Sequence, residues 1–346
     1  MKNKAIYFVR SNKTKFGGAE IYLQRLVDEL NKQNIHTQVI NSIFPNFLMS
    51  WFRAVLFNLY VCALKKDKFY FSLERITCPD IYRAGDGVHK VFMQIENKSP
   101  FRLLNIVYLY IEKRMFSNCK KIIAISNMVK NDIIKTYNIP AEKIAVVYNG
   151  IKIIPSDFDA SFKRLSKEFQ ISSDEKIFLY VGSGYKRKGV QEFLEILSRL
   201  KYRNFKAFIV GKENKIQHYK DIAKQLNLSK QVIFTGPRSD VNDFYTISDI
   251  FLFPTKYEPF GNVILEAMSF SNAVITTKFC GGGEILDQNY IMKTPQDNSI
   301  VDKIDALLAD PIKLAKVKEE NYQIVQNFTI EKNAKETMRI IYEYLH

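Results

Sequence analysis

Short runs of apolar residues alternate with helical patterns along the whole chain, and this alternation limits the possible folds more than any other feature. Before residue 151 the apolar runs predict strands at 5–9, 36–40, 69–73, 81–84, 121–126 and 144–148. After it they predict strands at 176–181, 206–210, 232–235, 250–253 and 273–276. A repeat of strand and helix favours parallel sheets covered by helices on both faces. We therefore expect an α/β fold.

A turn signal and a proline-bearing linker divide this repeat into two parts. Asn149-Gly150 is typical of a turn, and the segment 151–158 contains Pro155. A chain of 346 residues also suits two domains better than one. We predict an N-terminal domain of residues 1–150, a second domain of residues 151–329, and a last helix at about 330–346 that packs back on the first. Both domains are expected to be doubly wound sheets that face a cleft.

The formal net charge of +15 is concentrated in the first half. Residues 1–150 hold 23 Lys and Arg against 11 Asp and Glu, whereas residues 151–346 hold 28 against 25. Such asymmetry indicates that the first half meets an anionic surface, either a membrane or a nucleic acid. Because no helix-turn-helix, RRM or zinc signature is present, we expect no nucleic acid.

Two apolar stretches in the basic half bear on the membrane. The stretch 92–116 interleaves aromatic and basic residues, which favours a helix at an anionic membrane interface over an ordinary core-facing helix. The stretch 47–64 is interrupted by Arg53 and Asn58, which favours a buried or surface helix over a membrane span. We therefore predict a cytoplasmic protein held peripherally at the inner face of the membrane, since the N-terminal stretch is too short for a signal peptide.

Residues that bind metals or form disulfides are scattered. The cysteines are Cys62, Cys78, Cys119 and Cys280, and no two of them form a C-x-x-C pair. This spacing predicts neither a disulfide framework nor a zinc site, and it fits a reducing compartment. One Asp-x-Asp pair, Asp157-Phe-Asp159, lies in the expected linker and is interpreted as solvated. No cofactor and no metal are therefore expected.

Two glutamates in the second half flank a glycine at the expected start of a helix. Glu258 follows the strand at 250–253, Gly261 lies where the helix begins, and Glu266 lies within it. The amides expected at that helix N-terminus, where phosphates and sugar hydroxyls bind readily, are those of Phe260, Gly261, Asn262 and Val263. Either glutamate alone is more typical of a solvated surface, whereas the spaced pair favours ligand binding.

The segment 258–266 resembles the E-x7-E motif of retaining family 4 glycosyltransferases, which have the GT-B fold. Further segments resemble other parts of that family: 15–20 its N-terminal glycine loop, 178–189 its phosphate-binding strand and loop, and 232–238 its base-binding turn. The segments 82–89 and 182–189 carry a closer likeness to the lipopolysaccharide core glucosyltransferases.

The resemblance implies a role for each donor-site residue. Glu258 binds hydroxyls of the donor sugar, and Glu266 binds the ribose of the nucleotide. Arg187 and Lys188 clamp the diphosphate, as the planar fork of Arg and the point charge of Lys suit phosphate oxygens. The region of Arg238 touches the base, largely through backbone. The amides after Glu258 hold the sugar and the distal phosphate.

This chain departs from the family pattern at Ser183, where many members have an arginine, and Arg187 is expected to substitute for it. In the first half, Gly17 and Gly18 are expected to present amides to the diphosphate or the acceptor. An ordinary turn, or a solvated basic turn at 186–188, is the simpler alternative for these segments.

The resemblance also implies that the loop after the strand at 81–84 faces the reacting carbon. Asp86 would receive the acceptor proton or orient its hydroxyl, and His89 would assist. The alternative is that Asp86 caps a turn and His89 lies at the surface. Retaining enzymes of this fold are thought to react on one face of the sugar, so we expect no covalent intermediate.

The sequence thus predicts a glycosyltransferase that moves a hexose from a nucleotide-sugar, with UDP favoured, to a lipid-linked glycan such as lipopolysaccharide core. The expected partners are that donor, that acceptor and an anionic membrane. The alternative is an inactive GT-B-like subunit that recruits a partner transferase to the membrane. A nicotinamide dehydrogenase is disfavoured, since no G-x-G-x-x-G follows the first strand.

Overall fold

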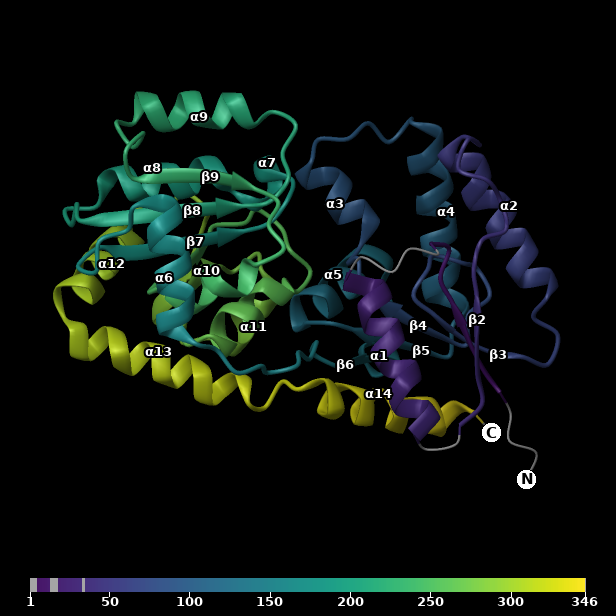
Figure 1. The fold of residues 1–346 in the computed structure, drawn as a ribbon. Coiled ribbons are helices and arrows are strands. Elements are labelled where there is room, and N and C mark those ends of the chain that lie inside the picture. Colours follow the sequence, from purple (N-terminus) through teal and green to yellow (C-terminus); the bar gives the residue numbers. More distant parts are fainter. Residues whose placement is uncertain (1–4, 13–17, 33–34, 346) are drawn as a thin grey trace. The chain divides into compact units, whose positions relative to one another are not determined.

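The computed structural model describes residues 5–12, 18–32 and 35–345, and the chain divides into two compact units (Figure 1). Unit 1 comprises residues Met1–Gly150 and Ile330–His346, and unit 2 comprises Ile151–Thr329. Over the described residues each unit contains one six-stranded parallel sheet with helices on its faces. The α/β class expected from the alternating sequence pattern is therefore confirmed.

The sheet of unit 1 has the strand order β2-β1-β3-β4-β5-β6. Its strands are β1 Ile6–Val9, β2 Thr37–Ile40, β3 Phe69–Ser72, β4 Ile81–Ala84, β5 Lys121–Ala124 and β6 Ile144–Val146. Its helices are α1 Gly18–Lys32, α2 Ser50–Ala63, α3 His89–Ile95, α4 Leu103–Asn118, α5 Asn127–Tyr137 and α14 Ile330–Tyr344, with a 3-10 turn at Ala141–Lys143. Strand order reverses between β1 and β3, and ligands of such sheets bind beyond the carboxyl ends of the strands at that point.

Strand β3 shows how the alternation of side chains builds two layers in unit 1. Phe69 and Phe71 belong to a core that includes α1 and α14, whereas Tyr70 belongs to a second core with Phe57 and Val61 of α2. Successive side chains of a strand point to opposite faces, so a run of buried residues predicts a strand covered on both sides.

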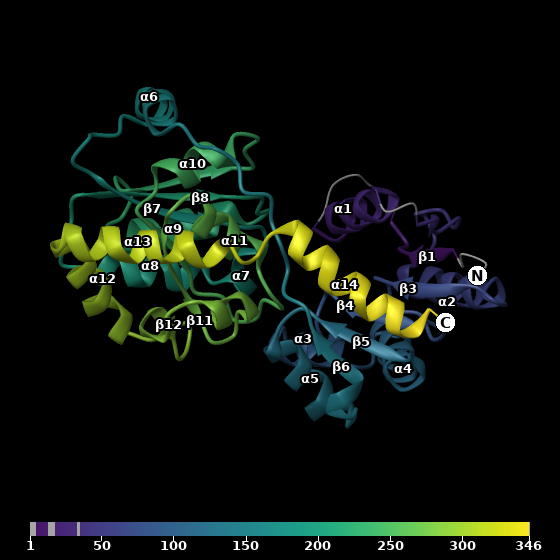
Figure 2. The same cartoon turned by 90° about the horizontal axis from the view of Figure 1, so that it is seen from below.

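Helix α14 joins the end of the chain to unit 1. Its residues Met338, Ile340 and Ile341 are buried in the core that Leu26 and Leu30 of α1 also enter. Figures 1 and 2 show α14 lying beside α1. The apolar stripe of α14 therefore has its partner in unit 1, although 179 residues of unit 2 separate α14 from the rest of that unit.

The cysteines correct one prediction. Cys62 and Cys78 form a disulfide, although their spacing indicated that no cysteines would pair. Cys62 lies near the end of α2, and Cys78 lies between β3 and β4. Asn58 of α2 accepts a hydrogen bond from the backbone N–H of Thr77 at 2.7 Å, which ties the two segments together. This contact depends on how α2 packs, and local sequence does not report it. Cys119 and Cys280 are buried free thiols.

The aromatic and basic stretch 92–116 is two helices rather than one. Helix α3 ends at Ile95, and α4 begins only at Leu103. Asn97 between them has a φ of 49°, in the left-handed region that asparagine tolerates, so the chain leaves the helical path there. Helix α2 has 14 residues, and along the described chain no helix is both long and apolar enough to cross a bilayer.

The sheet of unit 2 has the order β12-β11-β10-β7-β8-β9. Its strands are β7 Lys176–Val181, β8 Phe205–Val210, β9 Val232–Gly236, β10 Ile250–Phe253, β11 Ala273–Thr277 and β12 Ile291–Met292. Counted from β7, this is the dinucleotide-binding order 3-2-1-4-5-6, whose reversal lies between β7 and β10. The sequence analysis missed β12, because two residues are too few to show a period.

Helices cover the sheet of unit 2 on both faces (Figure 1). They are α6 Phe158–Phe169, α7 Tyr185–Lys188, α8 Val190–Arg199, α9 Ile216–Gln225, α10 Val241–Ile247, α11 Asn262–Ser269, α12 Ser299–Ala309 and α13 Pro311–Val325, with 3-10 turns at Gly281–Ile285 and Gln288–Tyr290. The Asp157 side chain accepts a hydrogen bond from the backbone N–H of Ala160 at 2.9 Å. It therefore caps α6, and both Asp157 and Asp159 are exposed, as the solvated interpretation expected, although Asp159 lies within α6 rather than in the linker.

The packing of α14 predicts that Ile341→Ala destabilises unit 1. The buried side chain leaves a cavity, so the free energy of unfolding should fall by about 2–5 kcal/mol. Tyr342→Ala, at a neighbouring residue whose side chain is 40% exposed, should change it by about 0.5 kcal/mol or less. Urea unfolding, with hydrogen exchange of β1 and β3 to locate the loss, measures both. Equal losses in the two variants would contradict this role of α14.

Candidate functional site

The loops that follow β7 and β10 lie at the point where strand order reverses in unit 2. β7 and β10 pair directly, with Phe178 opposite Ile250. β7 leads through Gly182 to the single turn of α7, and β10 leads to Glu258 and then to α11. Since both strands are parallel, their carboxyl ends meet at one edge of the sheet. The two motifs that the sequence analysis placed in one site are therefore neighbours.

Gly189 allows the two loops to pack against each other. It has a φ of 82°, and a Cβ on it would lie only 2.0 Å from the Pro254 carbonyl oxygen. The backbone N–H of Lys256 donates a hydrogen bond to the Arg187 carbonyl at 2.9 Å. A side chain at position 189 would separate the loops, so this glycine is required by close approach as well as by backbone conformation.

The contact between the loops brings two cations to Glu258. Arg187 Nη1 lies 3.3 Å and Lys188 Nζ 3.4 Å from the same oxygen, Glu258 Oε2. Arg187 also donates to the Tyr257 carbonyl. All three charged side chains are less than a quarter exposed. A carboxylate beside two cations is complementary to a ligand that carries hydroxyls next to negative oxygens.

Helix α11 begins directly beyond Glu258. Gly261 precedes it with a φ of 83°, and a Cβ there would lie 3.0 Å from Glu258 Cγ and 3.3 Å from Cys280 Sγ. The helix itself runs Asn262–Ser269, one residue later than predicted. First-turn amides have no acceptor within their own helix, and they carry the positive end of the helix dipole. The structure thus places Phe260, Gly261, Asn262 and Val263 at one helix end beside the charged cluster.

Three consecutive glycines that the sequence analysis did not single out support this helix end. Gly281 N–H donates to the Glu258 carbonyl at 2.9 Å, and Gly282 N–H donates to the Phe260 carbonyl at 2.7 Å. A Cβ on Gly282 would lie 2.7 Å from the Phe260 oxygen. The signal was available, because a triple glycine a few residues after a predicted strand marks close backbone approach.

Glu266 points to another neighbour that the sequence analysis missed. The hydroxyl of Tyr245, on α10, donates a hydrogen bond to Glu266 Oε2 at 3.0 Å. Burial and the Glu266 carboxylate raise the pKa of Tyr245, so the phenol stays protonated and remains a donor. Glu266 is therefore held in one orientation by α10. Sequence reasoning did not find Tyr245, because the contact joins two helices.

Arg238 follows β9, but its guanidinium already has partners. It forms paired hydrogen bonds with both oxygens of Glu168, at 2.7 and 2.9 Å, and with both oxygens of Asp240, each at 2.8 Å. These carboxylates raise its pKa. The side chain therefore anchors the loop after β9, which leaves the backbone as the part of this region available to a ligand. The prediction that this region meets a base stays a prediction.

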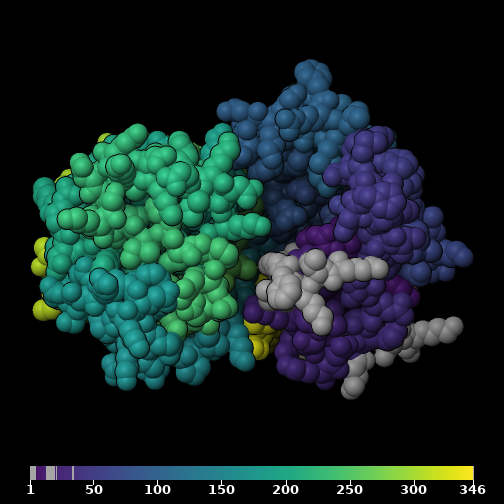
Figure 3. All heavy atoms as spheres, turned by 45° about the horizontal axis from the view of Figure 1, so that its top comes forward, coloured from purple at the N-terminus to yellow at the C-terminus, as the bar shows by residue number. Residues whose placement is uncertain are grey.

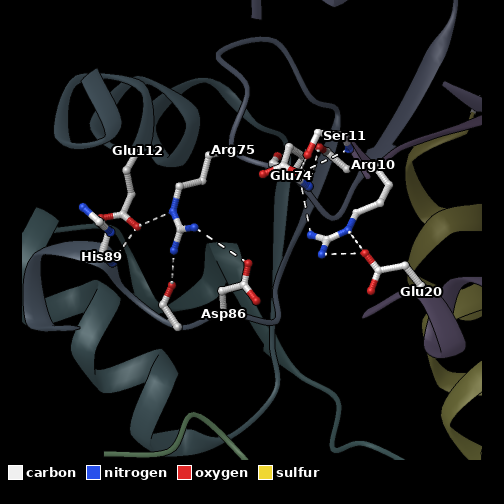
Figure 4. Close-up of polar contacts among 10 residues, drawn as sticks. Arg10, Ser11, Glu20, Glu74, Arg75, Asp86, His89 and Glu112 are labelled. Carbon is white, nitrogen blue, oxygen red and sulfur yellow. Dashed lines mark hydrogen bonds and ion pairs between the residues drawn. The ribbon is translucent and has the colours of Figure 1, made fainter. Parts of the chain in front are cut away.

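In unit 1 a buried carboxylate organises the loops after β3 and β4 (Figure 4). Glu112 of α4 is fully buried and accepts hydrogen bonds from Arg75 Nε at 3.1 Å, His89 N–H at 2.8 Å and the Tyr137 hydroxyl at 2.7 Å. The other side of the Arg75 guanidinium lies 3.8 Å from Asp86, whose side chain is 53% exposed. Arg75 thus joins a buried anion to an accessible one, and the sequence analysis singled out neither Arg75 nor Glu112.

His89 is buried, so the alternative that it lies at the surface is wrong. Burial and the nearby Arg75 guanidinium lower its pKa, which keeps the ring neutral at neutral pH. Its Nε2 lies 3.1 Å from Asn105 Oδ1, and the amide nitrogen of Asn105 donates to the Ser99 carbonyl at 2.7 Å. Because Asn105 Oδ1 is then the acceptor, Nε2 carries the proton and Nδ1 is the basic nitrogen of the neutral ring.

A second ion-pair cluster lies at the switch point of unit 1 (Figure 4). Arg10, directly after β1, lies 2.9 Å from Glu20 and 3.6 Å from Glu74, and the hydroxyl of Ser11 donates to Glu74. Of the predicted glycines, Gly18 begins α1, whereas Gly17 lies outside the described residues. Over the part of the chain that the structure describes, no group of three or more His, Cys, Asp and Glu side chains could hold a metal ion.

Comparison with known proteins agrees with this geometry. Residues 161–324 match the family model of group 1 glycosyl transferases, and residues 87–153 match that of Glycosyltransferase Family 4. An uncharacterized glycosyltransferase of Methanocaldococcus jannaschii is 28% identical over 204 residues, which are 56% of this chain and 52% of that protein. The chain spans about half the length of the curated relatives it matches.

Solved structures share the fold over nearly the whole chain. The crystal structure of WaaG, a glycosyltransferase involved in lipopolysaccharide biosynthesis, has a TM-score of 0.80 at 20% identity and covers 97% of this chain and 99% of its own. Anabaena HepE in complex with UDP and glucose has a TM-score of 0.76 at 17% identity, and the match covers 98% of this chain and 100% of HepE. The fold is therefore GT-B, and the chain belongs to the family 4, or group 1, glycosyltransferases.

The buried pair in unit 1 predicts that Arg75→Met is strongly destabilising. Glu112 would be left as a buried charge without its cation, which typically costs about 3–5 kcal/mol. Adding Glu112→Gln should restore part of the loss, because the neutral amide oxygen can accept from His89 N–H while the amide NH2 donates to the Tyr137 hydroxyl. Arg102→Met, at an exposed arginine, is the matched control. Chemical denaturation measures all three, and a double variant no more stable than Arg75→Met would contradict the assignment.

Proposed function

We propose that the protein is a retaining glycosyltransferase that moves a hexose from a UDP-sugar to a lipid-linked glycan, with lipopolysaccharide core as the favoured acceptor. One observation carries the proposal. In unit 2, Glu258 and the cations Arg187 and Lys188 converge beside a helix N-terminus at the switch point of a dinucleotide-binding sheet. A sugar diphosphate carries hydroxyls next to negative oxygens, which is the chemistry that this cluster complements.

Each charged group has a role at the moment when the glycosidic bond breaks. The diphosphate leaving group gains negative charge as the bond to the anomeric carbon lengthens. Arg187, Lys188 and the first-turn amides of α11 are already oriented where that charge grows, so they stabilise the transition state without reorganisation. Glu258 accepts hydrogen bonds from sugar hydroxyls and thereby orients the anomeric carbon. Glu266, which Tyr245 holds in place, binds the ribose.

Support for UDP comes from fold relatives. HepE, which shares the fold, was crystallised with UDP and glucose. Lipopolysaccharide as the source of the acceptor is supported by the likeness to WaaG, whose structure is described as that of an enzyme of lipopolysaccharide biosynthesis. WaaG is 20% and HepE 17% identical to this chain, and the panel of donors below tests which UDP-sugar is used.

Asp86 is the residue of unit 1 that we assign to the acceptor. It lies in the loop after β4, its carboxylate is exposed, and the buried Arg75 guanidinium orients it. An ionised carboxylate there accepts the hydrogen bond of an incoming hydroxyl and receives its proton as the new glycosidic bond forms. His89 is buried under the same loop and keeps α3 and α4 in place through Glu112 and Asn105. No covalent sugar–enzyme intermediate is invoked.

An apolar surface on unit 1 supports contact with a membrane. Helices α2 and α4 pack against each other, and both leave large apolar side chains exposed; Figure 3 shows α2, in indigo, at the surface. We call this set the α2–α4 surface: Phe47, Met49, Phe52, Leu59, Phe101, Leu103, Ile106 and Tyr110. The exposed basic residues Arg102, Lys113 and Arg114 accompany it on and beside α4. Apolar and basic residues together suit an interface with anionic lipid.

The donor role predicts that Glu258→Gln loses transfer but keeps nucleotide binding. Loss of one oriented polar contact in the transition state costs about 3 kcal/mol, so turnover should fall by about 100-fold or more. UDP alone should bind as tightly as in the unaltered protein, or more tightly, because Arg187 and Lys188 are released from the Glu258 charge. UDP release with a panel of hexose donors and a lipid A–core acceptor measures turnover, and calorimetry measures UDP affinity.

The matched control is Glu319→Gln, at an exposed glutamate of α13 that should leave both measurements unchanged. Near-normal turnover in Glu258→Gln would contradict the assigned role. UDP binding by the unaltered protein with no turnover on any donor would instead favour the alternative of an inactive binding subunit.

The membrane role predicts that Ile106→Glu weakens binding to anionic vesicles. Burying an isoleucine side chain contributes at least about 1.5 kcal/mol, so the partition coefficient should fall by about tenfold or more. Ile312→Glu is the matched control, because Ile312 is equally apolar and 83% exposed but lies on α13 of unit 2. Vesicle sedimentation with phosphatidylglycerol–phosphatidylcholine mixtures measures both, and added salt should weaken binding. Equal retention of the two variants would remove the support for this surface.

A further inference from the structure

Tyr180, in β7, carries a buried hydroxyl that the proposed reaction has not used. The side chain is fully buried, and its Oη has no hydrogen-bond partner among the residues that the structure describes. A buried polar group without a partner is costly, and phenylalanine would fill the same space without that cost. An unpaired hydroxyl at this position therefore points to a partner that another state of the protein supplies.

Other buried tyrosines of the chain have the partner that Tyr180 lacks. Tyr70 donates to the Val61 carbonyl at 3.1 Å, Tyr185 donates to the Gly211 carbonyl at 3.1 Å, and Tyr245 donates to Glu266. These three hydroxyls each donate a hydrogen bond, whereas the Tyr180 hydroxyl donates none to the described residues. What distinguishes Tyr180 is its place, because it lies next to the last residue of β7, directly before the phosphate loop.

The Tyr180 hydroxyl and the Lys188 ammonium flank one point in space. A Cβ built on Gly182 would lie 3.6 Å from Tyr180 Oη, 3.4 Å from Lys188 Nζ and 3.0 Å from Lys188 Cδ. The Lys188 stem thus passes close to Gly182, its ammonium contacts Glu258 Oε2 at 3.4 Å, and the Tyr180 hydroxyl lies near the same glycine. The rest of the pocket around Tyr180 is aromatic, formed by Tyr185, Phe193 and Phe253.

We propose that Tyr180 is a positioning residue for Lys188: its hydroxyl oxygen accepts a hydrogen bond from the Lys188 ammonium once a diphosphate draws that ammonium away from Glu258. The inference rests on the proposed donor site. A phosphate oxygen and the Tyr180 hydroxyl then fix two of the three ammonium protons, which leaves the lysine one orientation at the leaving group. Gly182 is required as well, since a side chain there would stand between the two groups.

Tyr180→Phe tests this directly, because it removes one oxygen and keeps the ring. We expect UDP to bind about tenfold more weakly, which corresponds to about 1.4 kcal/mol. The melting temperature of the ligand-free protein should stay the same or rise, because the variant loses only an unpaired polar atom. In the Lys188→Ala background the same substitution should have no effect on UDP affinity, since the hydroxyl acts through the lysine.

Tyr70→Phe is the matched control, a buried tyrosine of unit 1 whose hydroxyl is paired. It should lower the melting temperature and leave UDP affinity unchanged. Unaltered UDP binding by Tyr180→Phe, or an equal loss with and without Lys188, would overturn the inference while the proposed function stands. Failure of the unaltered protein to bind UDP at all would overturn both. Calorimetry and thermal unfolding supply every measurement.

Discussion

The proposed donor site of this protein depends on one contact, the approach of the loop after β7 to the loop after β10. Gly189 lets the first loop lie against the Pro254 carbonyl, and the Lys256 amide binds the Arg187 carbonyl. This contact fixes the positions of Arg187 and Lys188 and therefore their distances to Glu258. Parallel strands place such loops at one edge of the sheet, but only a residue without Cβ allows them to touch.

Unit 1 uses a different device, a buried charge. Glu112 has three hydrogen-bond donors, and each comes from a different element, so the carboxylate ties the loop after β3 to α3 and α5. A buried ion pair contributes little net stability compared with apolar packing, yet it fixes orientation because every donor must be satisfied. As a result, the buried side of the Arg75 guanidinium is held by Glu112, and its other side faces Asp86.

Much of this could be predicted from the sequence, because it follows from local pattern. The buried strands appeared as apolar runs, and Glu258 and Glu266 appeared as acidic residues on either side of a glycine. Contacts between distant parts of the chain could not be predicted, for one common reason. The Cys62–Cys78 bond, the Tyr245–Glu266 contact and the pairing of Arg75 with Glu112 each join elements distant in sequence. Periodicity reports which face of an element is apolar, and it does not report which element will cover that face.

By itself, then, the sequence determined the kinds of element, their order and the chemical types gathered in each loop, since these depend on propensity, period and composition over a few residues. The tertiary structure alone decided which charges meet. Arg187 and Lys188 contact one oxygen of Glu258, and Arg238 pairs with the carboxylates of Glu168 and Asp240. His89 is buried, and the Tyr180 hydroxyl has no partner among the described residues. The reason is geometric: hydrogen bonds and ion pairs act over about 3–4 Å. Only the packing of whole elements brings groups from different parts of the chain that close.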